Sequence, residues 1–196
     1  MADGLLLERA LRRAAVWHRD QVRKGGDVPY VSHLAGVAVL LARAGFDEDV
    51  IAAGLLHDAT EDTDATLDEI QAEFGPRVAE LVAVCSEVKL DAEGKKRPWI
   101  DRKTDHLEAL ADAPASARAV ILADKLHNLL SIQADLADGL PVWSRFNADR
   151  DRVLWYYRRS IAVADRGDDP RLKALADAAR VALAAVEAVG EIAPSA

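Results

Sequence analysis

The sequence predicts an all-α protein, a single helical bundle of about eight to ten helices, and three observations lead to this fold class. Only 11 Gly and 7 Pro interrupt the 196 residues. The long segments between them are rich in Ala, Leu, Arg and Glu, residues that favour helices. Apolar residues make up 51% of the chain and charged residues 30%, which suits one buried core under a charged surface.

Capping residues and apolar periodicity define the helices of the first half. Gly45 ends an apolar helix, and Asp47 is placed to cap the next one. Thr66 opens a capping-box pattern with Glu69, and Pro76 stands at a favoured first position of a helix. The helices that follow from these signals cover residues 5–22, 32–44, 47–56, 66–74 and 76–84.

Longer helices are predicted for the second half. Pro98 and Ser116 stand where two of them begin, and Pro170 follows an aspartate at the start of the last. These helices cover residues 98–111, 118–137, 143–164 and 170–190. No repeat or linker divides the chain, so we expect one domain over residues 1–196, with a motif core at 7–160 and a C-terminal helical extension at 161–196.

The composition disfavours two classes of partner. The 25 Lys and Arg against 33 Asp and Glu give a formal net charge of −8, whereas binders of nucleic acid or anionic membranes are normally basic. No stretch approaches the roughly 18 apolar residues of a membrane span. A lone cysteine, Cys85, forms no internal disulfide, so nothing demands an oxidising compartment. We expect a cytoplasmic protein with a small-molecule partner.

The segment over residues 54–63 is the most informative about chemistry, because one imidazole and three carboxylates follow an apolar helical run. On a helix, His57 lies over Glu61, and Asp58 lies over Asp62, so the four side chains can converge on one turn. Carboxylates this close repel one another unless a cation or proton compensates. A bound metal ion resolves that cost. The alternative is a helix that ends at Asp58 and leaves an acidic segment in water.

A second set of residues points to the same chemistry. His33 stands at the start of an apolar helix, and Asp124 follows an apolar run in mid-helix, where a carboxylate needs a partner. An ion pair of Asp124 with Lys125 or Arg118 is the alternative explanation. Two imidazoles and two carboxylates form a mixed donor set that suits manganese, iron, cobalt or zinc. The candidate metal ligands are His33, His57, Asp58 and Asp124.

Five short sequence motifs occur one after another along the chain. They are Arg-Lys-Gly at 23–25, Pro-Tyr-Val-Ser-His at 29–33, Leu-Leu-His-Asp at 55–58 with Glu-Asp-Thr at 61–63, Phe-Gly at 74–75, and Leu-Ala-Asp-Lys-Leu-His-Asn-Leu at 122–129. In this order they resemble the hydrolase domain of the RelA/SpoT family within the HD phosphohydrolase superfamily. The likeness is greatest to its stand-alone small alarmone hydrolases, the metazoan SpoT homologues.

The resemblance implies a reaction and a cofactor. Members of this family remove pyrophosphate from the 3′ position of alarmone nucleotides such as guanosine 3′,5′-bis(diphosphate), and the adenosine analogues are similar substrates. The reaction uses one manganese ion. The four candidate ligands match the family's metal site, at which the ion polarises a phosphoryl oxygen and activates water.

The resemblance also implies roles for residues outside the ligand set. Glu61 and Asp62 match the acidic pair that orients or deprotonates the attacking water, and solvation of a helix end is their alternative role. Arg23 and Lys24 match a basic motif that neutralises phosphate charge, although such a pair can also complement a helix dipole. The residues expected to bind substrate are Arg23, Lys24, Asn128 and Tyr156.

Two departures from the family pattern affect the expected specificity. Leu34 follows His33 where the family usually has proline, and Gly25 follows Lys24, so no hydroxyl residue stands there. The preference for guanine or adenine and the oligomeric state stay open. Two other functions also stay open: an HD-family phosphatase or phosphodiesterase acting on another nucleotide such as NADPH, and a non-catalytic helical sensor that binds an alarmone.

Overall fold

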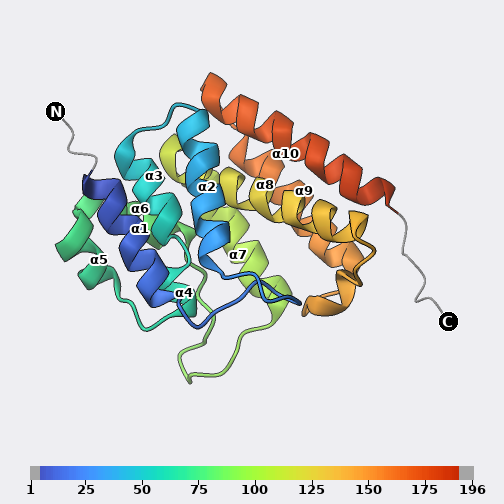
Figure 1. Cartoon of the computed structure of the whole chain (residues 1–196), viewed down its shortest axis with the longest axis horizontal. Coiled ribbons are helices and arrows are strands. Elements are labelled where there is room, and N and C mark those ends of the chain that lie inside the picture. Colours follow the sequence, from blue (N-terminus) through green and yellow to red (C-terminus); the bar gives the residue numbers. More distant parts are fainter. Residues whose placement is uncertain (1–4, 190–196) are drawn as a thin grey trace.

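The longest helix, α8 (Ala115–Ala137), crosses the middle of the fold in the computed structural model, which describes residues 5–189 (Figure 1). Its first half is mostly buried, as expected of a helix at the centre of a bundle. Four of its consecutive residues, from Val120 to Ala123, are buried. It packs against α2 (Val31–Arg43), α3 (Glu48–Leu56) and α10 (Pro170–Ala188).

Within the described residues the chain forms ten α-helices, one short 3₁₀ helix and no β-strand. The prediction of an all-α bundle is therefore confirmed. The remaining elements are α1 (Leu5–Trp17), α4 (Ala59–Asp62), α5 (Leu67–Phe74), α6 (Pro76–Cys85), α7 (Trp99–Asp112), the 3₁₀ helix η1 (Trp143–Arg145) and α9 (Arg150–Ala164).

The helices are arranged on two sides of the α2–α8 pair. In Figure 1, α1, α3, α5 and α6 lie on one side of the molecule, and α9 and α10 lie on the other. The capping box at Thr66 opens α5, and the side chains of Asp47 and Asp169 cap α3 and α10, as the sequence predicts for the first two. Local side-chain caps therefore fix the starts of these three helices.

The first helix is shorter than its apolar pattern predicts. It ends at Trp17 instead of residue 22, because the next backbone groups pair across a loop. The Arg23 amide donates to Val28, and the Tyr30 amide donates to Gln21. Gly25 allows the chain to reverse there, with a φ of 82° that other residues rarely adopt.

The predicted helix over 143–164 is divided in two. A 3₁₀ turn, η1, is followed by an irregular stretch, and α9 begins only where the Asp149 side chain accepts a hydrogen bond from the Arg152 amide. The capping residue Asp149 thus sets the start of α9, although the apolar periodicity begins earlier in the sequence. None of the described helices combines the length and the apolarity needed to span a lipid bilayer.

Candidate metal centre and substrate pocket

The four candidate metal ligands come from three helical segments that meet at the centre of the bundle. His33 lies in the first turn of α2, and Asp124 lies in the middle of α8. His57 and Asp58 occupy the break between α3 and α4, where the helix does not continue. The apolar helices thus carry all four polar side chains into one place.

Their donor atoms lie close together. His33 Nε2 is 3.2 Å from Asp124 Oδ1 and 3.7 Å from Asp58 Oδ2. His57 Nε2 is 3.1 Å from Asp58 Oδ2 and 3.8 Å from Asp124 Oδ1. Ligands held at roughly 2.0–2.2 Å from one ion lie about 3 Å or more from each other, so these separations suit a shared divalent cation.

The chemistry of these atoms also fits a metal ion. His57 Nε2 is buried and makes no hydrogen bond within residues 5–189, whereas its Nδ1 bonds to the Gly54 carbonyl at 2.8 Å. Burying a ring nitrogen that has no hydrogen-bond partner costs free energy unless the nitrogen binds a cation. Ligand-capable atoms of His33, His57 and Asp58 all lie within 4.8 Å of one another.

The charges within this cluster depend on one another. Burial alone raises the pKa of Asp58, but the neighbouring His57 holds it well below its ordinary value. Burial likewise acts to raise the pKa of Asp124, and Lys125 together with the two histidines lowers it well below the ordinary value. Both carboxylates are therefore ionised at neutral pH, the form that binds metals.

Further side chains hold the two carboxylates in place. The Tyr30 hydroxyl donates to Asp58 Oδ2 at 2.7 Å. Lys125 Nζ lies 2.6 Å from Asp124 Oδ2, and the Asn128 amide donates to Asp124 Oδ1 at 2.5 Å. The ion pair proposed as an alternative for Asp124 therefore exists, but it engages only one carboxylate oxygen and leaves Oδ1 directed to the histidines.

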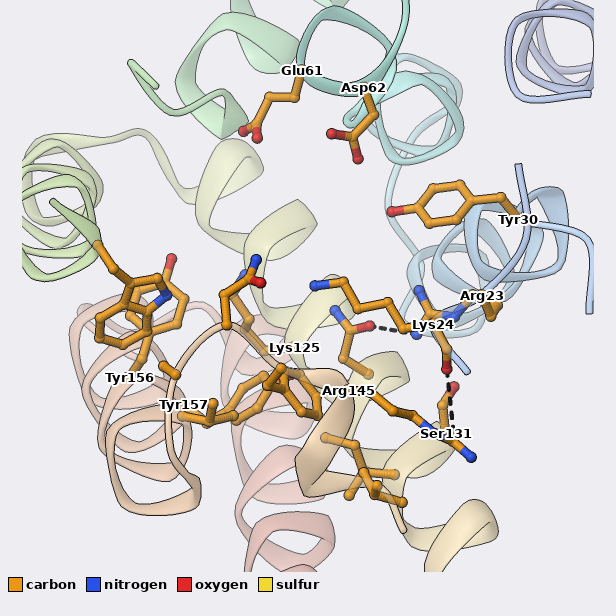
Figure 2. A pocket seen from close by; sticks show the side chains of 18 of the residues that line it. Arg23, Lys24, Tyr30, Glu61, Asp62, Lys125, Ser131, Arg145, Tyr156 and Tyr157 are labelled. Carbon is orange, nitrogen blue, oxygen red and sulfur yellow. Dashed lines mark hydrogen bonds between the residues drawn. The ribbon is translucent and has the colours of Figure 1, made fainter. Parts of the chain in front are cut away.

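The predicted acidic pair projects from α4 into a pocket, where Figure 2 shows Glu61 and Asp62 side by side. Lys89 contacts both, with Nζ 3.1 Å from Glu61 Oε2 and 2.8 Å from Asp62 Oδ1. The Glu87 amide also donates to Glu61 Oε1 at 2.7 Å. Burial nevertheless raises the pKa of Glu61 above its ordinary value, which makes this carboxylate a better proton acceptor.

The predicted basic pair lies in the loop between α1 and α2. Arg23 donates to Asn128 Oδ1 at 2.7 Å, and its guanidinium lies 5.6 Å from the centre of the Tyr30 ring. Lys24 Nζ lies 5.5 Å from the centre of the Phe146 ring. Because α1 ends at Trp17, this pair does not stand on a helix terminus, and a helix-dipole role is excluded.

These groups surround a cavity of about 850 Å³, a volume typical of small-molecule sites. Figure 2 shows Arg23 and Lys24 on one side of it and Tyr156 on another. A smaller cavity of about 150 Å³, lined by His57, Asp58 and Asp124 among others, shares Glu61 and Asn128 with it. The cationic side chains that line the larger cavity are Arg23, Lys24, Lys89, Lys96, Arg102, Lys103, Lys125 and Arg145.

Tyr156 is buried at one wall of this pocket. Its hydroxyl lies 2.9 Å from His106 Nδ1. Lys103 and Lys125 extend over its ring, at 4.4 Å and 5.1 Å from the ring centre. Tyr156 therefore holds two cations near the site, in addition to any contact with a ligand.

All ten residues singled out in the sequence thus lie in or beside one region of the molecule. The region also contains polar residues to which the sequence motifs give no role, most clearly Tyr30, Lys89 and Glu87. Lys89 and Glu87 follow the end of α6, and only the folding of that segment against α4 brings them to Glu61. The sequence signal for Tyr30 is its position three residues before His33, about one helical turn away.

Comparison with known proteins gives a consistent result. A family model described as an HD domain matches residues 10–153. The human guanosine-3′,5′-bis(diphosphate) 3′-pyrophosphohydrolase MESH1 is 42% identical over 134 residues, which cover 67% of this chain and 70% of that protein. MESH1 of Mus musculus is 44% identical over 119 residues, or 59% of this chain and 63% of the mouse protein, slightly less than two thirds of its length.

A solved structure supports the same assignment. It is described as a metazoan ortholog of SpoT that hydrolyzes ppGpp and plays a role in starvation responses. It matches with a TM-score of 0.74 and 29% identity, covering 90% of this chain and 94% of that one. The chain therefore belongs to the HD domain family and, within it, groups with the stand-alone SpoT-like proteins.

Proposed function

We propose that this chain is a metal-dependent 3′-pyrophosphohydrolase that acts on guanosine 3′,5′-bis(diphosphate). The observation that carries the proposal is the convergence of two imidazoles and two carboxylates beside a cation-lined pocket of about 850 Å³. The similarity to MESH1, whose name states this activity, supports the choice of substrate. The adenosine analogues have the same phosphate groups and are the next substrates to test.

The metal would be held by the donor atoms of His33, His57, Asp58 and Asp124. When bound, a divalent ion supplies Lewis acidity towards water and phosphoryl oxygens. Manganese is our proposed ion because the resemblance to the RelA/SpoT hydrolase domain implies it, whereas two nitrogen and two oxygen donors suit iron, cobalt and zinc as well. Tyr30 and Asn128 keep the carboxylates oriented through the hydrogen bonds described above.

The acidic pair, Glu61 and Asp62, would accept the proton of the attacking water. Glu61 has a raised pKa, so it is suited to accept a proton as water attacks the phosphorus next to the 3′ oxygen. The bond between that phosphorus and the 3′ oxygen then breaks. Pyrophosphate leaves with the water oxygen, and the nucleoside 5′-diphosphate keeps its 3′ oxygen and gains a proton there. Lys89 keeps Glu61 and Asp62 together despite their like charge.

The cationic residues would compensate the charge of the substrate. Arg23 and Lys24 enter from the loop between α1 and α2, and Lys103 and Lys125 lie beside Tyr156. Such groups stabilise charge on a transferred phosphoryl group when they are fixed in advance. The Asn128 side chain joins Arg23 to Asp124, so it links the phosphate-binding group to a metal ligand.

We further propose that residues 1–196 act as one domain in the cytoplasm, without nucleic acid or a membrane as partner. The packing of α10 along α8 and α9 supports a single domain that includes the C-terminal helix. The net charge of −8 argues against a polyanionic polymer as partner. Cys85 is buried and unpaired, which suits a reducing compartment.

The proposal is tested by incubating the manganese-loaded protein with guanosine and adenosine 3′-diphosphate derivatives and, separately, with NADPH. We expect pyrophosphate release from the guanosine substrate and loss of that release in a chelator. Release of orthophosphate from NADPH, without pyrophosphate from either alarmone, would favour the alternative phosphatase. Binding of an alarmone without turnover would favour the sensor.

A further inference from the structure

The two histidines of the proposed metal site are oriented by different kinds of partner. His57 Nδ1 bonds to a backbone carbonyl, that of Gly54, at 2.8 Å. His33 Nδ1 instead meets the side chain of His127, with 2.9 Å between the two Nδ1 atoms. The orientation of His33 thus depends on a side chain that can be replaced, whereas the orientation of His57 does not.

His127 is held in a slot between α2 and α8. It lies three residues after Asp124 on α8, so it faces the same side of the helix as that ligand. Its ring packs directly on Gly36 of α2, where a Cβ atom would overlap Nε2 and Cδ2 of the imidazole. The missing side chain at Gly36 therefore creates the space that the ring fills.

The geometry also excludes His127 as a ligand itself. Its Nδ1 atom is hydrogen-bonded to His33, and its Nε2 atom packs against Gly36. A hydrogen bond between two Nδ1 atoms needs one proton, which either ring can carry. If His33 presents the lone pair of Nε2 to a metal, its proton is on Nδ1, and His127 Nδ1 accepts it.

We propose that His127 is a positioning residue, which accepts a hydrogen bond from His33 Nδ1 and thereby holds His33 Nε2 ready for the metal, with Gly36 supplying the slot. The inference rests on the proposed metal site. Partners of this kind fix the tautomer and the orientation of a ligating histidine, and their loss commonly weakens metal binding about 10–100-fold.

Two variants separate the hydrogen bond from the packing. In His127→Phe, an aromatic ring still fills the slot at Gly36, but no acceptor faces His33. In His127→Asn, a side-chain oxygen stands near the place of Nδ1 and can accept the bond, although the slot is less filled. We expect Mn²⁺ affinity, measured by calorimetry on the metal-free proteins, to fall about 10–100-fold for Phe and clearly less for Asn.

The tautomer of His33 gives a readout that packing alone would not move. In wild-type protein loaded with diamagnetic Zn²⁺, imidazole ¹⁵N NMR should show His33 bound to the metal through Nε2 with its proton on Nδ1, and His127→Phe should lose the hydrogen bond of that proton. Coordination of the metal through His33 Nδ1, or a His33 Nδ1 proton without a hydrogen bond, would overturn the inference, as would wild-type affinity in the Phe variant. If the wild type itself binds no divalent ion, the proposed function fails instead, so the two failures are distinguishable.

Discussion

Lys89 links the ends of two carboxylates that would otherwise repel each other. Burial lowers the pKa of its ammonium, but Asp62 and Glu61 raise it above its ordinary value, so the side chain stays charged. Short motifs identify the acidic pair itself, since its spacing is local. Lys89 is 28 residues from Glu61, and no periodicity reports a contact made by a folded-back loop.

Replacing Glu61 with Gln should remove the proposed proton acceptor while keeping the size of the side chain. We expect kcat to fall about 10²–10⁴-fold, the usual range for losing a general base. Mn²⁺ affinity should stay close to that of the wild type, because Glu61 is not among the ligands. The rates are measured by pyrophosphate release and the affinity by calorimetry. Unchanged turnover would assign the proton transfer to another group.

Removing the charge of Lys89 should disturb the acidic pair. Lys89→Met leaves Glu61 and Asp62 without their shared cation, so we expect kcat to fall about tenfold, the equivalent of about 1.4 kcal/mol. Lys95→Met is the matched control, since Lys95 is exposed in the same loop and does not line the pocket. Equal activity of the two variants would contradict a role for Lys89.

At the scale of helices, the termini decide where the functional groups stand. Apolar periodicity finds most of the helices, yet it joins the 3₁₀ turn η1 to α9 and places the end of the first helix at residue 22. The backbone of Val22 pairs with that of Pro29 instead of continuing the helix. Arg23 and Lys24 are therefore loop residues, and they line the pocket. The break between α3 and α4 lies at His57 and Asp58, and both side chains face the cluster.

Helix α10 depends on the residue that caps its N-terminus, Asp169. The Asp169 side chain accepts from the Arg171 amide at 2.9 Å, and hydrogen bonds from Arg171 lower its pKa to about 2. A lowered pKa adds stability above the unfolded value near 4, and this stability is lost as the pH falls towards 2.

Asp169→Ala should therefore cost about 0.5–2 kcal/mol of unfolding free energy at pH 7. The difference from the wild type should shrink between about pH 4 and pH 2, as followed by urea unfolding. The neighbouring Asp168→Ala, which removes an exposed carboxylate that caps no helix, is the matched control. A cost independent of pH would indicate that Asp169 acts without its charge.

The pair formed by His106 of α7 and Tyr156 of α9 predicts a second dependence on pH. Burial, with help from Lys125, lowers the pKa of His106 to about 4. The unfolded chain takes up this proton near pH 6.5, so stability should fall as the pH drops from about 6.5 to 4. His106→Gln should flatten the curve over that window, and an unchanged slope would contradict the assignment.

At the scale of the whole molecule, three segments far apart in sequence meet at one charged centre inside an apolar bundle. The sequence predicts this meeting because costly polar residues interrupt apolar runs at three places. It does not predict the support around them, such as Tyr30 on Asp58 or His127 on His33, which depends on how α2 crosses α8. Sequence motifs thus predict the metal ligands, whereas the orientation of the ligand side chains depends on tertiary contacts.

Metal removal should lower the stability of the entire bundle. An ion present at a hundred times its Kd stabilises the folded state by about 2.7 kcal/mol. For a chain of this size we expect the Tm to drop by about 5–10 °C in a chelator. His33→Ala protein should show no such metal-dependent shift. An equal shift in that variant would place the bound ion elsewhere.

Hydrolysis in ¹⁸O-labelled water tests the central claim most directly. Guanosine 3′,5′-bis(diphosphate) is incubated with the manganese-loaded protein, and mass spectrometry measures the mass of each product. Attack on phosphorus predicts one ¹⁸O atom in pyrophosphate and none in the guanosine 5′-diphosphate, with no products after chelation. Label in the nucleotide, orthophosphate as the sole phosphate product, or turnover that persists in chelator would contradict a metal-dependent 3′-pyrophosphohydrolase.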